Sequence, residues 1–86
     1  MSARKPGENA NLDMAQIMGY LQSYHAMHGY MPSNRDIATF FGVSVVAAQY
    51  WLNQLERFGH IQRPLKRANR AIRIVKRIEG HVYELG

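Results

Sequence analysis

The sequence predicts a mainly α-helical fold with a small β-hairpin, and three observations lead to this prediction. Three stretches carry apolar residues at helical spacing, and each has a polar capping residue at its start and a glycine after its end. After the third stretch, residues 60–63 and 71–75 alternate in the way of two strands around a loop at 64–70. The chain has only 86 residues, so these elements must share one small core.

The first helix is expected from Leu12 to about His28, and Gly29 supplies the stop signal. Asn11 suits its N-cap, and Asp13 in the first turn suits the positive end of the helix dipole. The buried stripe recurs at steps of three and four residues and consists of Met14, Ile17, Met18, Leu21 and Tyr24.

The second and third predicted helices stand close together. Ser33 fits the N-cap of the second helix, with Asp36 three residues later as in a capping box, and this helix ends near Phe41. A tight turn at 42–44 follows, because Gly can take the left-handed conformation and Ser can cap the next helix, which spans 45–58. Helix, short turn and helix form the helix-turn-helix unit, whose second helix enters the DNA major groove. The alternative is an αα-hairpin without a nucleic-acid role.

With the hairpin at 60–75, the pattern becomes a winged helix-turn-helix: three helices and a two- or three-stranded wing. We expect residues 1–10 to form a flexible tail and residues 11–75 to form the domain. Residues 76–86 form a C-terminal tail that could add a strand or contact a second subunit.

Charge and composition favour a polyanionic partner. The formal net charge is +5, and four arginines and one lysine lie among residues 63–73 without an acid. The absence of cysteine excludes disulfides, thiolate catalysis and cysteine-based zinc sites. No apolar run approaches the roughly 18 residues of a membrane span, and no signal peptide is recognisable, so we expect a cytoplasmic protein of a prokaryotic cell, phage or plasmid.

Two pieces of the chain match a known family closely: Gly29-Tyr30-Met31-Pro32-Ser33 and Arg70-Ala71-Ile72-Arg73-Ile74. Less specific matches between them are Ile37-Ala38, Phe41-Gly42, Ala47-Ala48, Leu52, Leu55 and Gly59-His60-Ile61. On these residues, the segment 29–75 resembles the N-terminal winged helix-turn-helix DNA-binding domain of the LexA repressors.

The chain also departs from that family. Val46 stands where the family carries a base-reading Asn, and Gln49 and Tyr50 stand where it carries paired acids, so the resemblance implies a different operator. LexA repressors also have a self-cleaving peptidase domain with a Ser–Lys dyad, for which a chain ending at Gly86 has no room. We therefore expect an isolated domain or a small stand-alone regulator, without cleavage-based induction unless a further domain is missing.

Three groups of residues are candidates for DNA contact. On the recognition helix (residues 45–58), the candidates including its cap are Ser44, Val45, Val46, Ala47, Gln49, Tyr50 and Asn53. On the wing they are Arg63, Lys66, Arg67, Arg70 and Arg73. At the start of the second helix, Ser33, Asn34 and Arg35 could hold a phosphate.

The chemistry of these side chains indicates an A/T-rich half-site. Gln49 can pair bidentately with adenine, and Asn53 can do the same or reach a phosphate. Val45, Val46 and Ala47 can contact thymine methyl groups, and Tyr50 can donate a hydrogen bond to a phosphate. About five cationic contacts predict a slope of log affinity against log salt of about −4 to −5.

We thus expect a sequence-specific double-stranded DNA-binding transcriptional regulator, a repressor, with a homodimer on a two-fold site as a further hypothesis. The rival is a protein-interaction module that grips a regulator or polymerase subunit through Val45 and Val46. No enzyme, cofactor, metal, membrane or small-molecule ligand is expected. His25 and His28 lack a carboxylate ligand pattern, and no glycine-framed elbow surrounds a serine.

Overall fold

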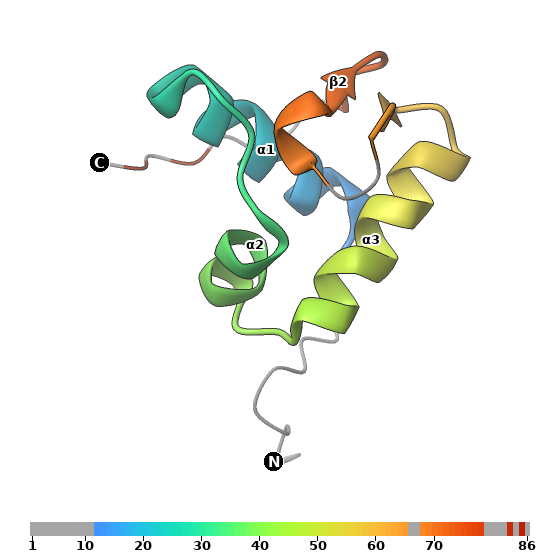
Figure 1. The fold of residues 1–86 in the computed structure, drawn as a ribbon. Helices are drawn as coiled ribbons and strands as arrows, with labels where there is room; N and C mark the ends of the chain where they lie inside the picture. The colour runs from blue at the N-terminus through green and yellow to red at the C-terminus, as the bar shows by residue number, and fades with distance from the viewer. Residues whose placement is uncertain (1–11, 66–67, 79–82, 84, 86) are drawn as a thin grey trace.

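The computed structural model describes residues 12–65, 68–78, 83 and 85. Three helices, α1 (Met14–His28), α2 (Asn34–Phe41) and α3 (Val45–Arg57), are followed by a hairpin of β1 (Ile61–Gln62) and β2 (Arg73–Ile74) (Figure 1). The strands are antiparallel, with Ile61 opposite Ile74 and Gln62 opposite Arg73. The predicted fold class is confirmed: a mainly helical domain with a helix-turn-helix (α2 and α3) and a wing, which we define as residues 61–74.

The start of α1 differs from the prediction. Asp13, not Asn11, is the N-cap, and Asn11 lies outside the described residues. The Asp13 carboxylate accepts the Gln16 N–H at 2.9 Å, and the Gln16 side chain accepts the Asp13 N–H at 2.9 Å. This reciprocal pair stabilises a start at Met14 and leaves Leu12 ahead of the helix, buried in the core as a hydrophobic staple. Gln16, three residues after Asp13, was the sequence signal for this cap.

The caps of α2 and α3 are confirmed. Ser33 Oγ accepts the Asp36 N–H and the Asp36 carboxylate accepts the Ser33 N–H, both at 3.0 Å. Gly42 ends α2 at a φ of 68°, the left-handed conformation expected of it. Ser44 Oγ then accepts the Ala47 N–H at 3.0 Å and starts α3, which ends at Arg57, one residue earlier than expected.

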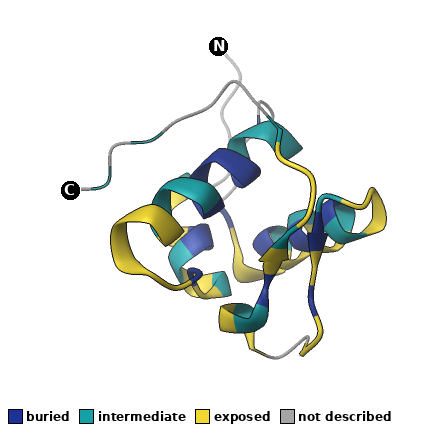
Figure 2. Cartoon of the chain, turned by 90° about the horizontal axis from the view of Figure 1, so that it is seen from above, coloured by how far each residue is buried: buried dark blue, intermediate teal, exposed yellow. Residues whose placement is uncertain are grey.

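The core joins all three helices to the wing. Figure 2 shows the buried segments of the elements toward the middle of the domain and the exposed ones around them. The largest fully buried side chains of the core are Ile17, Met18 and Leu21 of α1, Ile37 of α2, Leu52 and Leu55 of α3, Ile61 of β1, and Pro32. On α3 the buried residues Ala48, Leu52 and Leu55 recur at steps of four and three and so share one face, which turns the opposite face outward.

The two strands of the wing, at 61–62 and 73–74, are shorter than the strands predicted at 60–63 and 71–75. Residues Asn69–Ala71 form a 3-10 turn instead, in which the Ile72 N–H donates to the Asn69 carbonyl at 3.0 Å. A backbone that makes these local hydrogen bonds cannot pair across the hairpin at the same residues. The predicted alternation does hold beyond the turn, since Ile72 is buried and Arg73 is exposed.

Three of the described residues of the C-terminal tail pack against their own domain. Ile78, Tyr83 and Leu85 are partly buried against the core. The Tyr83 N–H donates to Ser23 Oγ at 3.0 Å, and the Tyr83 ring stands edge-on to Phe40 with centroids 5.1 Å apart. None of these described residues lies in a strand, so the extra strand is not found there; the dimer contact stays a prediction.

Candidate nucleic-acid interface

The outward face of α3 exposes most of the predicted recognition residues together. Val45 is 45% exposed, Val46 75% and Tyr50 52%, and Gln49 and Asn53 are exposed beside them. No acidic residue occurs on α3 before Glu56. This face combines apolar surface with amide and phenol groups, which is the chemistry of contacts to thymine methyls, base edges and phosphates.

Two residues of the predicted recognition set have structural roles as well. The Ser44 hydroxyl is the acceptor that caps α3, although the residue is exposed. Ala47 is half-buried and packs against the core. Ser44 and Ala47 lie on either side of the exposed Val45 and Val46 at the start of α3.

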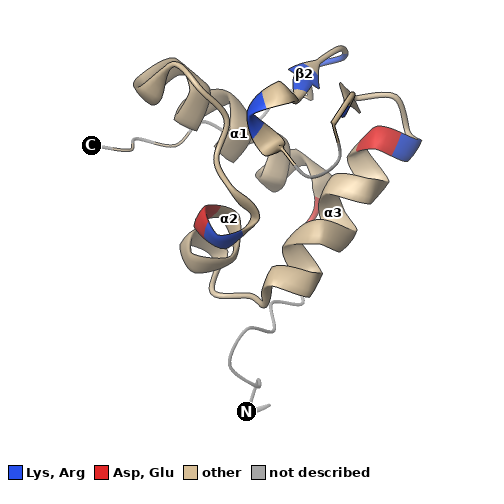
Figure 3. Cartoon of the chain, in the orientation of Figure 1, with Lys and Arg blue, Asp and Glu red and all other residues tan. Residues whose placement is uncertain are grey.

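Basic side chains are also exposed on the wing. Arg70 and Arg73 are exposed, whereas Lys66 and Arg67 lie outside the described residues. The Arg70 guanidinium carbon lies 4.8 Å from the centroid of the Tyr30 ring, which holds the charge over an aromatic face. Figure 3 shows basic positions on the wing and in the first turn of α2, where Arg35 is exposed.

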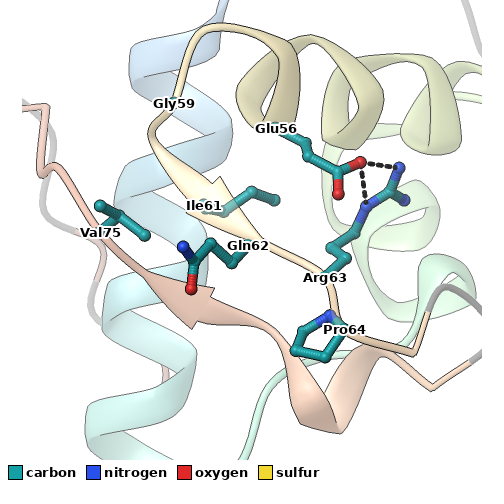
Figure 4. Close-up of a pocket in the computed structure, with 7 residues that line it drawn as sticks. All are labelled: Glu56, Gly59, Ile61, Gln62, Arg63, Pro64 and Val75. Atoms are coloured by element: carbon teal, nitrogen blue, oxygen red, sulfur yellow. Dashed lines mark hydrogen bonds and ion pairs between the residues drawn. The ribbon is translucent and has the colours of Figure 1, made fainter.

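Arg63 is a correction to the predicted wing contacts. It is only 6% exposed, and it forms an ion pair with Glu56 at 3.0 Å (Figure 4). The same guanidinium donates a hydrogen bond to Asn53 Oδ1. A buried arginine that is paired with a carboxylate is a structural group and does not project to DNA. The sequence held a signal for this position, because Arg63 follows Ile61 by two residues and so shares its inward strand face.

Asn69 is a residue that the sequence interpretation missed. Its Nδ2 donates to the Pro32 carbonyl at 3.1 Å and to Asn34 Oδ1 at 2.7 Å, which ties the wing to the start of α2. A hollow of about 260 Å³ lies at this junction, lined by Tyr30, Met31, Ser33, Asp36, Ala68, Asn69 and Arg70. No local pattern in the sequence marks this role.

The fold engages the acids and leaves most of the basic groups on the surface. In the part of the chain that the structure describes, Asp13 and Asp36 cap helices and Glu56 pairs with Arg63. The other described basic side chains are all exposed: Arg35, Arg57, Arg70, Arg73, Lys76 and Arg77. The described surface is therefore cationic, as binding to a polyanion requires.

The described residues offer neither a metal-binding cluster nor a membrane-spanning helix. Among the described residues, no group of three or more His, Cys, Asp or Glu side chains could hold a metal ion. No helix in the described part of the chain is long and apolar enough to cross a membrane.

Three helices with a capped turn between α2 and α3, followed by a two-stranded wing, define a winged helix-turn-helix protein. The FaeA-like protein family matches residues 14–76, and the chain belongs to this family. The chain is also 42% identical over 65 residues to a LexA repressor of Pseudothermotoga lettingae, which confirms the resemblance found in the sequence. This match covers 76% of the chain and 32% of that repressor, so the chain spans about a third of its relative's length.

Proposed function

We propose that this protein is a DNA-binding transcriptional regulator, a repressor, that inserts α3 into the major groove. The observation that carries the proposal is the exposed face of α3 at Val45–Asn53, which has no acid, on a domain whose wing exposes Arg70 and Arg73. The similarity to a LexA repressor supports the same conclusion. A repressor of this kind acts by occupying a promoter, so it needs shape, charge and affinity but no chemistry.

In this proposal the first two turns of α3 face the base edges. Gln49 pairs with adenine through its amide, and Val45 and Val46 contact thymine methyl groups. Tyr50 donates its phenol hydrogen to a phosphate, which fixes the register of the helix on the duplex. These contacts favour an A/T-rich half-site.

The wing and the start of α2 supply the phosphate contacts. Arg70 and Arg73, with Lys66 and Arg67, hold phosphates or enter the minor groove. Ser33, Asn34 and Arg35 approach a phosphate from the other side, and Arg35 adds charge there. With Arg63 removed from the set, four wing cations predict a slope of log affinity against log salt of about −3.6.

Fluorescence anisotropy tests the proposal with two labelled duplexes, one of random sequence and one from the promoter nearest the gene. We expect tighter binding to the promoter duplex and a slope near −3.6 across a salt series. The variant R70A/R73A should lower the steepness of that slope by about 2. The control R57A removes an exposed arginine at the other end of α3 and should leave the slope unchanged. No binding by the wild-type chain at low salt would contradict the proposal.

A second candidate is a protein-interaction module, and the exposed valines at the start of α3 are the observation that favours it. A partner such as a regulator or polymerase subunit would cover Val45 and Val46, which are 45% and 75% exposed. Replacing Lys66, Arg67 and Arg70 by alanine separates the two functions, since DNA binding should collapse while a complex centred on the valines should survive. The hypothesis of a homodimer on a two-fold site is part of the first proposal. Gel filtration that shows a monomer both free and bound to DNA would contradict the homodimer.

A further inference from the structure

We propose that Arg63 determines what Asn53 recognises: its guanidinium holds the Asn53 carbonyl oxygen, so that Asn53 acts on DNA as a hydrogen-bond donor and not as an adenine reader. The inference rests on the proposed function, because it concerns the same face of α3. It assigns Arg63 a positioning role in place of the direct contact expected from the sequence.

Arg63 reaches α3 from the end of β1, and two of its nitrogens are held by one carboxylate. Nε and Nη2 lie 3.3 Å and 3.0 Å from Glu56 Oε1, and Nη2 also donates to Asn53 Oδ1. The Arg63 side chain is 3% exposed and that of Glu56 28%. Figure 4 shows the guanidinium turned toward α3 and held against Glu56. The ion pair with Glu56 anchors the guanidinium, so Arg63 stays in place beside Asn53.

The chemistry of the guanidinium fixes the orientation of the amide. Arginine carries five N–H donors and no acceptor, so the atom of Asn53 that faces it must be the carbonyl oxygen. The two ends of an asparagine amide are often interchangeable, but here only one orientation forms the hydrogen bond. The exposed Asn53 is left with its NH₂ group to offer to a ligand.

This orientation disfavours the bidentate adenine contact that the sequence suggested. In that contact Asn Oδ1 accepts from adenine N6 while Nδ2 donates to N7. An adenine amino group would have to approach an oxygen that already bears a donor and a positive charge. The Asn53 NH₂ group and the positive charge beside it instead attract hydrogen-bond acceptors, which are guanine O6, guanine N7, thymine O4 and phosphate.

Selection of binding sites from a random duplex library tests this assignment with the wild type, N53A, R63M and R63M/E56Q. The double variant also replaces the carboxylate that pairs with Arg63 in the wild type, and circular dichroism verifies that each variant is folded. The wild type should prefer guanine or thymine at one position of the site, and N53A should lose that preference. If the acceptor is a phosphate, N53A should instead bind all sites more weakly by the same factor. Both Arg63 variants should gain an adenine preference of at least about fivefold that depends on Asn53.

Other results would overturn the inference. An adenine preference in the wild type that N53A removes would contradict the donor role of Asn53. An unchanged profile in both Arg63 variants would show that Arg63 does not set that role. Absence of DNA binding by the wild type would instead overturn the proposed function and the inference with it.

A matched pair of amide-to-acid variants tests the donor role by affinity. N53D keeps an oxygen for Arg63 but loses both donors, whereas Q54E makes the same chemical change at the next residue, which is half-buried. N53D should bind the selected site about tenfold more weakly than Q54E, because both variants add one negative charge and lose an amide donor, but only N53D loses a donor that we propose contacts DNA. Equal losses would contradict the inference.

Discussion

The helix-turn-helix and the wing are built in different ways. Each helix begins at a capping side chain from its own segment, and α2 ends at a glycine in the left-handed conformation. The wing has only two residue pairs in its ladder, and side chains attach it to the helices: Asn69 to the start of α2, and Arg63 to Glu56 of α3. The helices are therefore specified by their local sequence, whereas the position of the wing is set by its contacts with the helices.

This difference has a functional consequence. The recognition face is fixed by the packing of α3, whose Leu52 and Leu55 are fully buried on the opposite side. The wing is anchored by the buried Ile61 and Ile72, and the position of its cations depends in addition on a small number of polar contacts. A change in the core should therefore unfold the whole domain, and a change at the wing contacts should alter DNA affinity with a smaller loss of stability.

The largest effect is expected in the helical part. L52A removes a side chain that is 0% exposed in the core and should lower the free energy of unfolding by about 2–5 kcal/mol. V46A, on the exposed face of the same helix, should change it by less than about 0.5 kcal/mol. Urea denaturation followed by circular dichroism measures both values. Similar losses for the two variants would contradict the assignment of the α3 faces.

An intermediate effect is expected where the wing joins α2. N69A leaves the Pro32 carbonyl and Asn34 Oδ1 without their donor and should lower the free energy of unfolding by about 1 kcal/mol. Hydrogen exchange in β2 should accelerate more than exchange in the helices, and DNA affinity should fall severalfold. The control Q62A changes an exposed side chain of β1 and should leave all three quantities near the wild-type values. Uniform acceleration of exchange through the domain would contradict a local role for Asn69.

The smallest effect at neutral pH is expected for Y20F, which removes a 3.4 Å hydrogen bond to the Asp36 carbonyl. Burial, with added repulsion from Asp36 and Tyr24, raises the pKa of Tyr20 to about 12. The unfolded phenol ionises first, near its ordinary pKa of 10.0, so this contribution to stability is complete below pH 10 and is lost as the pH rises toward about 12.

Urea denaturation between pH 8 and 12 measures this contribution. The free energy of unfolding of the wild type should decrease above pH 10, and Y20F should show a shallower decrease. Parallel curves for the two proteins would show that Tyr20 does not titrate differently in the folded state.

Several features of the fold were predicted from local sequence alone. Ser33, Gly42 and Ser44 act on backbone groups within a few residues, so their spacing is sufficient to predict both ends of α2 and the start of α3. The start of α1 was misassigned because two residues could cap it, although Gln16 favoured Asp13. The exposed α3 face was predicted for the same reason, since helical periodicity settles which side chains point away from the core.

Tertiary structure decided the contacts between residues that are distant in the chain. Arg63 pairs with a carboxylate seven residues away, Asn69 bonds to Asn34 across 35 residues, and the Tyr83 N–H bonds to Ser23 across 60. The sequence determined the three helices, the caps of α2 and α3 and the centre of the buried stripe of α1, because these depend on neighbours along the chain. The alternation from Ile61 favoured an inward Arg63, but only the folded structure decided that it is buried there, because the burial of a charged group depends on whether folding brings a carboxylate and an amide oxygen to it.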